Sequence, residues 1–168
     1  LIRLAADALL DEIGVALVHT ATRLSELDVS ADFVVNVTVP LAHLPVNVEA
    51  FEGGLPVLCE KPAAPTVADA LRQAASAEAH GQLLMISQSR RYFDGFRALR
   101  RAVAPLGEIG TVAVEFFKAP HFGGFREEMA HVLLVDMSIH HFDAVRSLLE
   151  SDPVAVYAEE YNPAWSWF

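Results

Sequence analysis

The tripeptide Glu60-Lys61-Pro62 directly follows an apolar run, residues 55–59, that is typical of a buried strand. In doubly wound α/β folds, ligands bind beyond the carboxyl ends of the parallel strands. A lysine at such an end can contact a bound small molecule, and the proline stiffens the backbone beside it. The alternative is a solvated lysine that pairs with Glu60. Residue type and position leave both interpretations open.

A second candidate pair, Asp136 and His140, lies four residues apart in an apolar segment with helical spacing. Residues at this spacing share one face of a helix, so the two side chains can hydrogen-bond or converge on one ligand. A histidine oriented by a carboxylate is a common general base near neutral pH. The alternative is a buried Asp–His pair that only ties the helix into the core.

The neighbouring residues His131, His141 and Asp143 raise the further alternative of a metal site. His140 and His141 are adjacent, however, and adjacent side chains point about 100° apart on a helix. The sequence also has neither a cysteine cluster nor a His-Glu-x-x-His motif. We therefore expect no metal site.

The first ninety residues alternate short apolar runs with segments of helical spacing. Thr66 and Asp69 resemble a capping box at the start of one such segment. Strands that alternate with helices indicate βαβ crossovers and a parallel sheet, which places the chain in the α/β class. We expect strands at residues 32–40, 55–59 and 83–87, and helices at residues 4–12, 43–52 and 67–80.

After Arg91 the pattern changes to longer elements. We place a domain boundary near Arg90, so that the two domains span residues 1–90 and 91–168. In the second domain we expect helices at residues 96–103 and up to about residue 150, a glycine-bearing loop at 120–125, and strands at 111–118 and 154–161.

Composition excludes several classes of protein. The 22 acidic residues outnumber the 12 lysines and arginines and give a net charge of −10, which argues against a nucleic-acid partner. Hydrophobic residues make up 53% of the chain, which excludes intrinsic disorder. The apolar runs are far shorter than the roughly 18 residues that a membrane-spanning helix needs. The apolar excess favours an oligomer or a piece of a longer chain.

The cysteine and glycine residues bear on the cellular compartment and on nucleotide-binding motifs. The single cysteine, Cys59, lies in a predicted strand and is expected to be an inert core thiol. One cysteine and no export signal favour a reducing, cytoplasmic location. Neither G-x-G-x-x-G nor G-x-x-x-x-G-K-[ST] occurs in the sequence.

Five motifs in order give the chain a resemblance to the Gfo/Idh/MocA family of nicotinamide-dependent oxidoreductases. Each motif alone is weak, but their order and spacing are fairly specific across residues 31–161. They are Thr38-Val39-Pro40 with His43, then Leu58-Cys59-Glu60-Lys61-Pro62, Arg90-Arg91-Tyr92, Leu106-Gly107-Glu108-Ile109-Gly110 and finally Asp136-Met137-Ser138-Ile139-His140-His141-Phe142-Asp143.

The resemblance implies a fold and an activity. Residues 1–90 would be the remainder of a dinucleotide-binding Rossmann domain. Residues 91–168 would begin a C-terminal α/β domain for substrate binding and oligomerisation, built on a mostly antiparallel sheet. The implied reaction is hydride transfer between NAD or NADP and a sugar, polyol or related alcohol or carbonyl, in a cytoplasmic homo-oligomer, either a dimer or a tetramer.

The resemblance also implies roles for particular residues. Lys61 corresponds to a lysine that contacts the nicotinamide ribose and the reacting hydroxyl, His140 to the proton acceptor, and Asp136 to its acidic partner. Such a histidine takes the hydroxyl proton while the lysine stabilises the developing alkoxide. The positions implied to line the cofactor site are Thr38, Pro40, His43, Glu60, Lys61 and Arg90.

The chain departs from the family at both ends. The glycine-rich loop and the acidic residue that contacts the ribose are missing, as is most of the C-terminal sheet, so we interpret the sequence as an internal fragment. Two alternatives use the same fold: a non-catalytic member that senses a dinucleotide or a sugar, and an enzyme of NAD-dependent elimination or glycosidic cleavage. Joint presence of Lys61, Asp136 and His140 favours the dehydrogenase.

Overall fold

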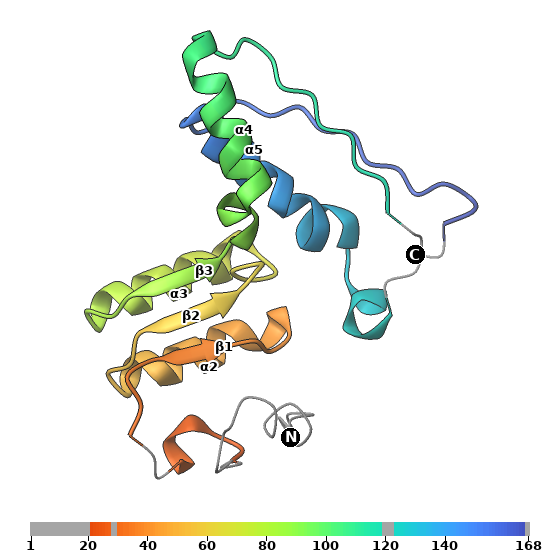
Figure 1. Ribbon diagram of the computed structural model, residues 1–168. Helices are drawn as coiled ribbons and strands as arrows, with labels where there is room; N and C mark the ends of the chain where they lie inside the picture. The colour runs from red at the N-terminus through yellow and green to blue at the C-terminus, as the bar shows by residue number, and fades with distance from the viewer. Residues whose placement is uncertain (1–20, 28–29, 119–122, 167–168) are drawn as a thin grey trace, which may run out of the picture. The chain divides into compact units, whose positions relative to one another are not determined.

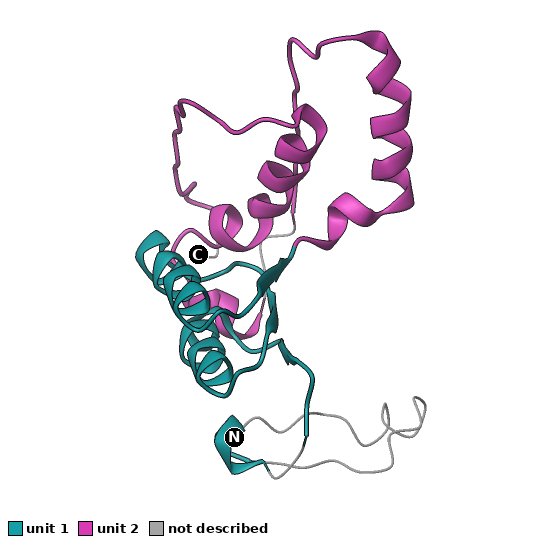
Figure 2. Ribbon diagram, turned by 90° about the vertical axis from the view of Figure 1, so that its left-hand side faces the viewer, with its two compact units in different colours: residues 1–87 teal, residues 88–168 magenta. Residues whose placement is uncertain are grey.

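The computed structural model describes residues 21–27, 30–118 and 123–166, and the chain divides into two compact units. Unit 1 is Leu1–Ser87 and unit 2 is Gln88–Phe168, shown in separate colours in Figure 2. Along the chain, unit 1 ends three residues before the domain boundary that the sequence predicts near Arg90. The helix expected at residues 4–12 lies outside the described residues.

Unit 1 is built on a parallel sheet of three strands in the order β1-β2-β3 (Figure 1). The strands are β1 (Val34–Asn36), β2 (Val57–Glu60) and β3 (Leu84–Ser87). Parallel pairing sets Val35 beside Leu58, and Leu58 beside Met85. The predicted α/β class with a Rossmann-like parallel sheet is confirmed.

Two helices, α2 (Pro40–Glu52) and α3 (Val67–Ala79), cover one face of this sheet (Figure 2). The core between the layers consists of Ala50, Phe51, Val57, Cys59 and Ala77. Val35 and Met85 lie on the strands but outside this core, and their side chains are about half exposed, at 51% and 46%. In the part of the chain that the structure describes, the sheet is therefore buried only on the face that the helices cover.

The strand expected at residues 32–40 is much shorter in the structure, because the chain turns after Asn36. The side-chain oxygen of Asn36 accepts hydrogen bonds from the amide and the hydroxyl of Thr38, at 3.1 and 2.6 Å. Such local bonds from asparagine favour turns over strand continuation. Pro40 then occupies the first turn of α2, where its missing N–H costs nothing.

Helix α3 follows its sequence prediction closely. Thr66 is the N-cap, and its hydroxyl oxygen accepts a hydrogen bond from the amide of Asp69 at 3.1 Å. The Thr66 hydroxyl also donates to the Asp69 carboxylate at 2.8 Å, so the expected capping interaction is confirmed.

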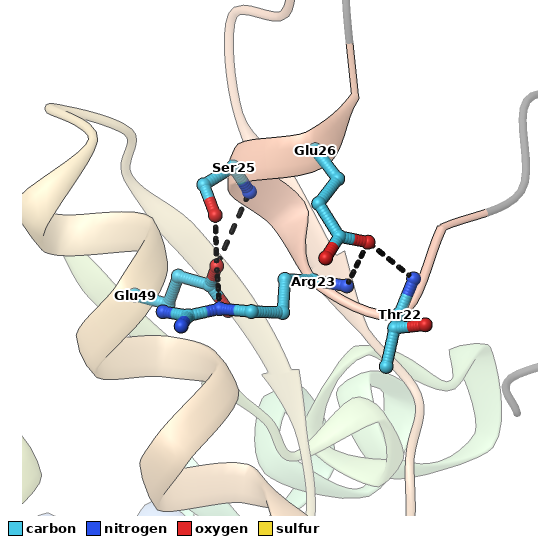
Figure 3. Close-up of polar contacts among 5 residues, drawn as sticks. All are labelled: Thr22, Arg23, Ser25, Glu26 and Glu49. Atoms are coloured by element: carbon cyan, nitrogen blue, oxygen red, sulfur yellow. Dashed lines mark hydrogen bonds and ion pairs between the residues drawn. The ribbon is translucent and has the colours of Figure 1, made fainter.

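The segment before β1 is fastened to α2 by Glu49 (Figure 3). One carboxylate oxygen of Glu49 accepts from the Ser25 amide, the Ser25 hydroxyl and the Arg23 guanidinium, at 3.1, 2.9 and 3.2 Å. Burial alone would raise the pKa of Glu49, but these hydrogen bonds and the Arg23 charge outweigh it and lower the pKa. The short 3-10 helix η1 (Leu24–Glu26) is thereby held against α2.

The regular secondary structure in the described part of unit 2 is helical. Its longer elements are α4 (Asp94–Val103), the π-helical η5 (Leu133–Ser138) and α5 (Ile139–Leu149), and its short 3-10 helices are η2 (Ser89–Tyr92), η3 (Ala104–Leu106) and η4 (Gly124–Glu128). The predicted helices of this half are confirmed, except that the last one begins with π-helical winding. None of the described helices is long and apolar enough to cross a membrane.

The strands predicted at 111–118 and 154–161 are wrong, since both segments are drawn as irregular chain in Figure 1. A strand is stable only when its backbone N–H and C=O groups pair with a neighbour. No β-pairing occurs among the described residues of unit 2, and Phe117 and Val154 are exposed. No strand of the expected antiparallel sheet therefore lies in this described part.

Candidate active site

The carboxyl ends of β1, β2 and β3 lie at one edge of the unit 1 sheet, because all three strands are parallel. Thr38 follows β1 within two residues, and Lys61 follows β2 directly. This edge is where open α/β sheets bind their ligands. The structure therefore brings the predicted residues of unit 1 to the appropriate end of the sheet.

Lys61 is half-buried, and its loop is held through the backbone. Its amide donates to a carboxylate oxygen of Glu60 at 3.2 Å. The peptide bond between Lys61 and Pro62 is cis. Pro62 is fully buried, so the loop is anchored immediately after the lysine.

The sequence resemblance places His43 at the cofactor site, and in the structure its side chain is fully buried. The ring lies between two backbone carbonyl oxygens: Nδ1 is 2.8 Å from Pro62 O, and Nε2 is 3.0 Å from Thr38 O. A neutral imidazole donates to one of these oxygens, whereas an imidazolium donates to both. His43 therefore connects the two loops that follow β1 and β2, and its contact with a cofactor stays a prediction. Pro40, also predicted to line the site, is likewise buried.

Asp136 is the most deeply buried charged residue among the predicted catalytic positions, with 1% of its surface exposed. The Nε–H of Arg126 donates to its carboxylate at 2.7 Å, and the same guanidinium stacks over Phe125 at 4.6 Å from the ring centre. Sequence reasoning did not give Arg126 this role. The available signal was physical, since a carboxylate buried in an apolar helix needs a cation.

His140 is half-buried in the first turn of α5, four residues after Asp136 in η5. The predicted spacing therefore spans the junction between π-helical and α-helical winding, instead of a regular α-helix. A π-helical turn within a longer helix frequently occurs at functional sites. This local geometry is consistent with a role for the two residues at one site.

Arg90 and Arg91 are both held by α5. Arg90 Nη1 donates to His141 Nε2 at 3.3 Å, and Arg91 forms a forked ion pair with Asp143, with Nε 2.9 Å from Oδ2. Burial lowers the pKa of His141, and the Arg90 charge lowers it further. Arg90 and Arg91 thus connect η2 to α5 within unit 2.

The side chains that could form the alternative metal site have separate partners. Asp143 pairs with Arg91, His141 accepts from Arg90, and His131 pairs with Glu160. Across residues 21–27, 30–118 and 123–166, no three histidine, cysteine or acidic side chains are arranged to hold a metal ion. Cys59 is fully buried, and burial raises the pKa of its thiol, as befits an inert core residue.

A family model described as "Oxidoreductase family, NAD-binding Rossmann fold", that of Gfo/Idh/MocA, matches residues 4–88. The chain is also 32% identical, over 94% of its length, to 1,5-anhydro-D-fructose reductase from Ensifer adhaerens, covering 49% of that protein. The chain belongs to the Gfo/Idh/MocA family.

Two further relatives agree with this assignment. Inositol 2-dehydrogenase 1 from Saccharopolyspora erythraea is 34% identical over 77% of this chain and 38% of its own. The crystal structure of a probable dehydrogenase from Thermotoga maritima superposes with a TM-score of 0.63 at 25% identity, over 74% of this chain and 38% of that one. The present chain thus spans less than half the length of each of these proteins.

The family binds NAD, and the carboxyl edge of unit 1 fits part of such a ligand. Lys61 supplies an ammonium group, Thr38 a hydroxyl oxygen, and the start of α2 a helix N-terminus. These groups suit the hydroxyls, the carboxamide and the anionic groups of a dinucleotide. The described residues do not include a glycine-rich phosphate loop.

Proposed function

We propose that the protein carrying this chain is an NAD- or NADP-dependent oxidoreductase that acts on a sugar, polyol or related alcohol or carbonyl compound. The observation that carries this proposal is the presence of Lys61 at the carboxyl end of β2 within a Rossmann-like unit of this family. Relatives named as an inositol 2-dehydrogenase and a 1,5-anhydro-D-fructose reductase support a polyhydroxylated substrate.

The chain's own residues supply the proton chemistry in this proposal. His140 accepts the proton of the substrate hydroxyl, and the Lys61 ammonium stabilises the oxygen as negative charge develops on it. Asp136 orients His140, and Arg126 balances the charge of the buried Asp136 carboxylate. The nicotinamide, when bound, accepts or donates the hydride.

We assign the cofactor contacts to residues near the carboxyl edge and to η2. Lys61 and Thr38 offer groups to the nicotinamide ribose, Glu60 and Pro40 shape the loops beside them, and Arg90 contributes a cation. His43 acts through the backbone of Thr38 and Pro62.

The test uses the full-length protein with NAD⁺ or NADP⁺ and myo-inositol, and with NADH or NADPH and 1,5-anhydro-D-fructose. Nicotinamide absorbance reports turnover. Lys61→Ala and His140→Ala should abolish turnover while protein fluorescence still reports cofactor binding. Full activity in both variants would contradict the assignment.

We also propose that the full-length protein is a cytoplasmic homo-oligomer. Exposed large apolar side chains in unit 2, including Phe117, Val156 and Trp165, support self-association. The free, buried Cys59 is consistent with a reducing compartment. Light scattering of the purified full-length protein measures the assembly, and a monomer at micromolar concentration would contradict it.

A further inference from the structure

Unit 1 buries three carboxamide side chains, which is costly unless each is hydrogen-bonded. Asn36 of β1, Asn47 of α2 and Gln73 of α3 are each at most 1% exposed. Asn36 Nδ2 donates to Asn47 Oδ1 at 2.7 Å, Asn47 Nδ2 donates to Gln73 Oε1, and Gln73 Nε2 donates to the carbonyl of Ala63. These bonds form one continuous line, here called the amide chain.

The two ends of the amide chain fix its direction. At one end the Thr38 backbone amide, which can only donate, bonds Asn36 Oδ1. At the other end the Ala63 carbonyl, which can only accept, takes the last hydrogen bond. Each carboxamide between them must therefore accept from its predecessor and donate to its successor, and no flipped orientation satisfies the line. Such aligned bonds also strengthen one another.

The amide chain connects the loop after β1 to the loop after β2 through the protein interior. His43 makes a second, shorter connection between the same loops, from the Thr38 carbonyl to the Pro62 carbonyl. Pro62 and Ala63 are the two residues that follow Lys61, so both of their carbonyls are held. The backbone that carries the lysine is thus fixed relative to Thr38 from two sides.

Resting on the proposed function above, we propose that Gln73, with Asn36, Asn47 and His43, is a set of positioning residues that holds the Lys61 loop and the Thr38 loop in the geometry of reaction. None of the four needs to touch a ligand, because all are buried. A small displacement of a reacting group lowers the reaction rate far more than it lowers the binding affinity, since only the transition state requires the aligned geometry.

Gln73 is the residue to change, because it is not itself a candidate site residue, lies on α3 and bonds the Lys61 loop directly. In the full-length protein, Gln73→Leu keeps the volume but removes both the acceptor for Asn47 and the donor for Ala63. We expect kcat to fall about ten- to hundredfold, with the affinity for NADH, measured by fluorescence, little changed. Gln82→Leu is the matched control, because Gln82 is only partly buried and its side chain donates to the His80 carbonyl at the end of α3, outside the amide chain.

The pH dependence of activity in the variant Gln73→Glu distinguishes a positioning role from a purely structural one. A protonated carboxyl group can accept from Asn47 and donate to Ala63, whereas a carboxylate cannot donate. Burial favours the protonated form. The activity of Gln73→Glu relative to wild type should therefore decrease as pH rises, while the same ratio for Gln73→Leu stays constant.

Amide hydrogen exchange of Lys61, Ala63 and Ala64 separates this inference from the proposed function. Exchange should be about tenfold faster in Gln73→Leu than in wild type, whether or not the protein turns over either substrate. Wild-type exchange in Gln73→Leu, or faster exchange with wild-type kcat, overturns the proposal. If Gln73→Leu does not fold, Gln73→Glu decides, and a wild-type rate at every pH overturns it. An inactive wild-type protein with the expected exchange change defeats the proposed function alone.

Discussion

The two units bury polar groups in different ways. Unit 1 satisfies its interior with uncharged carboxamides, Asn36, Asn47 and Gln73, that bond one another and the backbone. Unit 2 instead buries carboxylates, Asp136 and Asp143, and pairs each with an arginine. Each of these five buried side chains has a partner, but the kind of partner differs between the units.

This difference has consequences for how each unit responds to change. An uncharged network is insensitive to pH and to salt, and it fixes geometry through direction and distance. A buried carboxylate depends on its cation, because removal of that partner leaves a charge in a poorly solvated site. Unit 1 therefore resembles a rigid support, whereas unit 2 contains the charges suited to proton transfer.

The largest effect should follow from Arg126→Leu. Loss of one partner of a buried ion pair costs about 3–5 kcal/mol, and we expect the lower end because the Arg126 side chain is partly exposed. Urea denaturation of the full-length protein measures the loss. The double variant Arg126→Leu, Asp136→Asn should recover most of the stability, since the charge is then gone.

The control for this prediction is Arg100→Leu. Arg100 pairs with Glu150, but both side chains are substantially exposed, at 39% and 74%. Exposed pairs contribute about 0–1 kcal/mol. Equal losses of stability in the Arg100 and Arg126 variants would show that burial does not distinguish the two ion pairs.

A smaller effect is expected from Asn47→Leu in unit 1. The change removes the partner of Asn36 Nδ2 and of Gln73 Oε1, and an unsatisfied buried polar group costs about 1–3 kcal/mol. The loss should be the same at every pH at which the protein folds. The added cost of Gln73→Leu in this background should be less than its cost alone, because the two sites share a hydrogen bond. Additive losses, or a loss that varies with pH, would contradict the uncharged network.

The smallest effect concerns His141 in unit 2. Because its pKa is lowered in the folded state, the unfolded chain binds a proton at higher pH than the folded chain does. The free energy of unfolding should therefore decrease as pH falls from about 6.5, the unfolded value, to the lowered folded value, and level off below it. His141→Gln should make the pH dependence of the free energy of unfolding shallower, by the equivalent of up to one bound proton.

Urea denaturation over a series of pH values measures the slope in each variant. The control is His80→Gln, because His80 is exposed at the end of α3. Identical slopes for wild type and His141→Gln would contradict the prediction.

Local signals made α3 predictable and the length of β1 unpredictable. The cap formed by Thr66 and Asp69 involves residues three apart, so the sequence alone contains both partners. The run at residues 32–40 has strand-like composition, but the hydrogen bonds from Thr38 to Asn36 and the helical start at Pro40 override it. The segments 111–118 and 154–161 of unit 2 have the composition of strands, but neither pairs with another strand in the part of the chain that the structure describes.

The tertiary contacts of the candidate site were beyond the reach of pattern reasoning. Lys61, Asp136 and His140 were found because they stand in short motifs. Asn47 and Gln73 looked like ordinary polar positions on helices, since only packing shows that they face the interior. Their hydrogen-bond partners lie up to 26 residues away in the chain, and sequence periodicity does not reveal pairs at that separation.

The fixed direction of the amide chain restricts how the sequence of unit 1 can drift. A single replacement of Asn36, Asn47 or Gln73 leaves two neighbours unsatisfied, whereas concerted apolar replacement removes donors and acceptors together. The three positions are therefore expected to change as a group or not at all. Any natural variant with one of them altered should carry a compensating donor or acceptor at the next link.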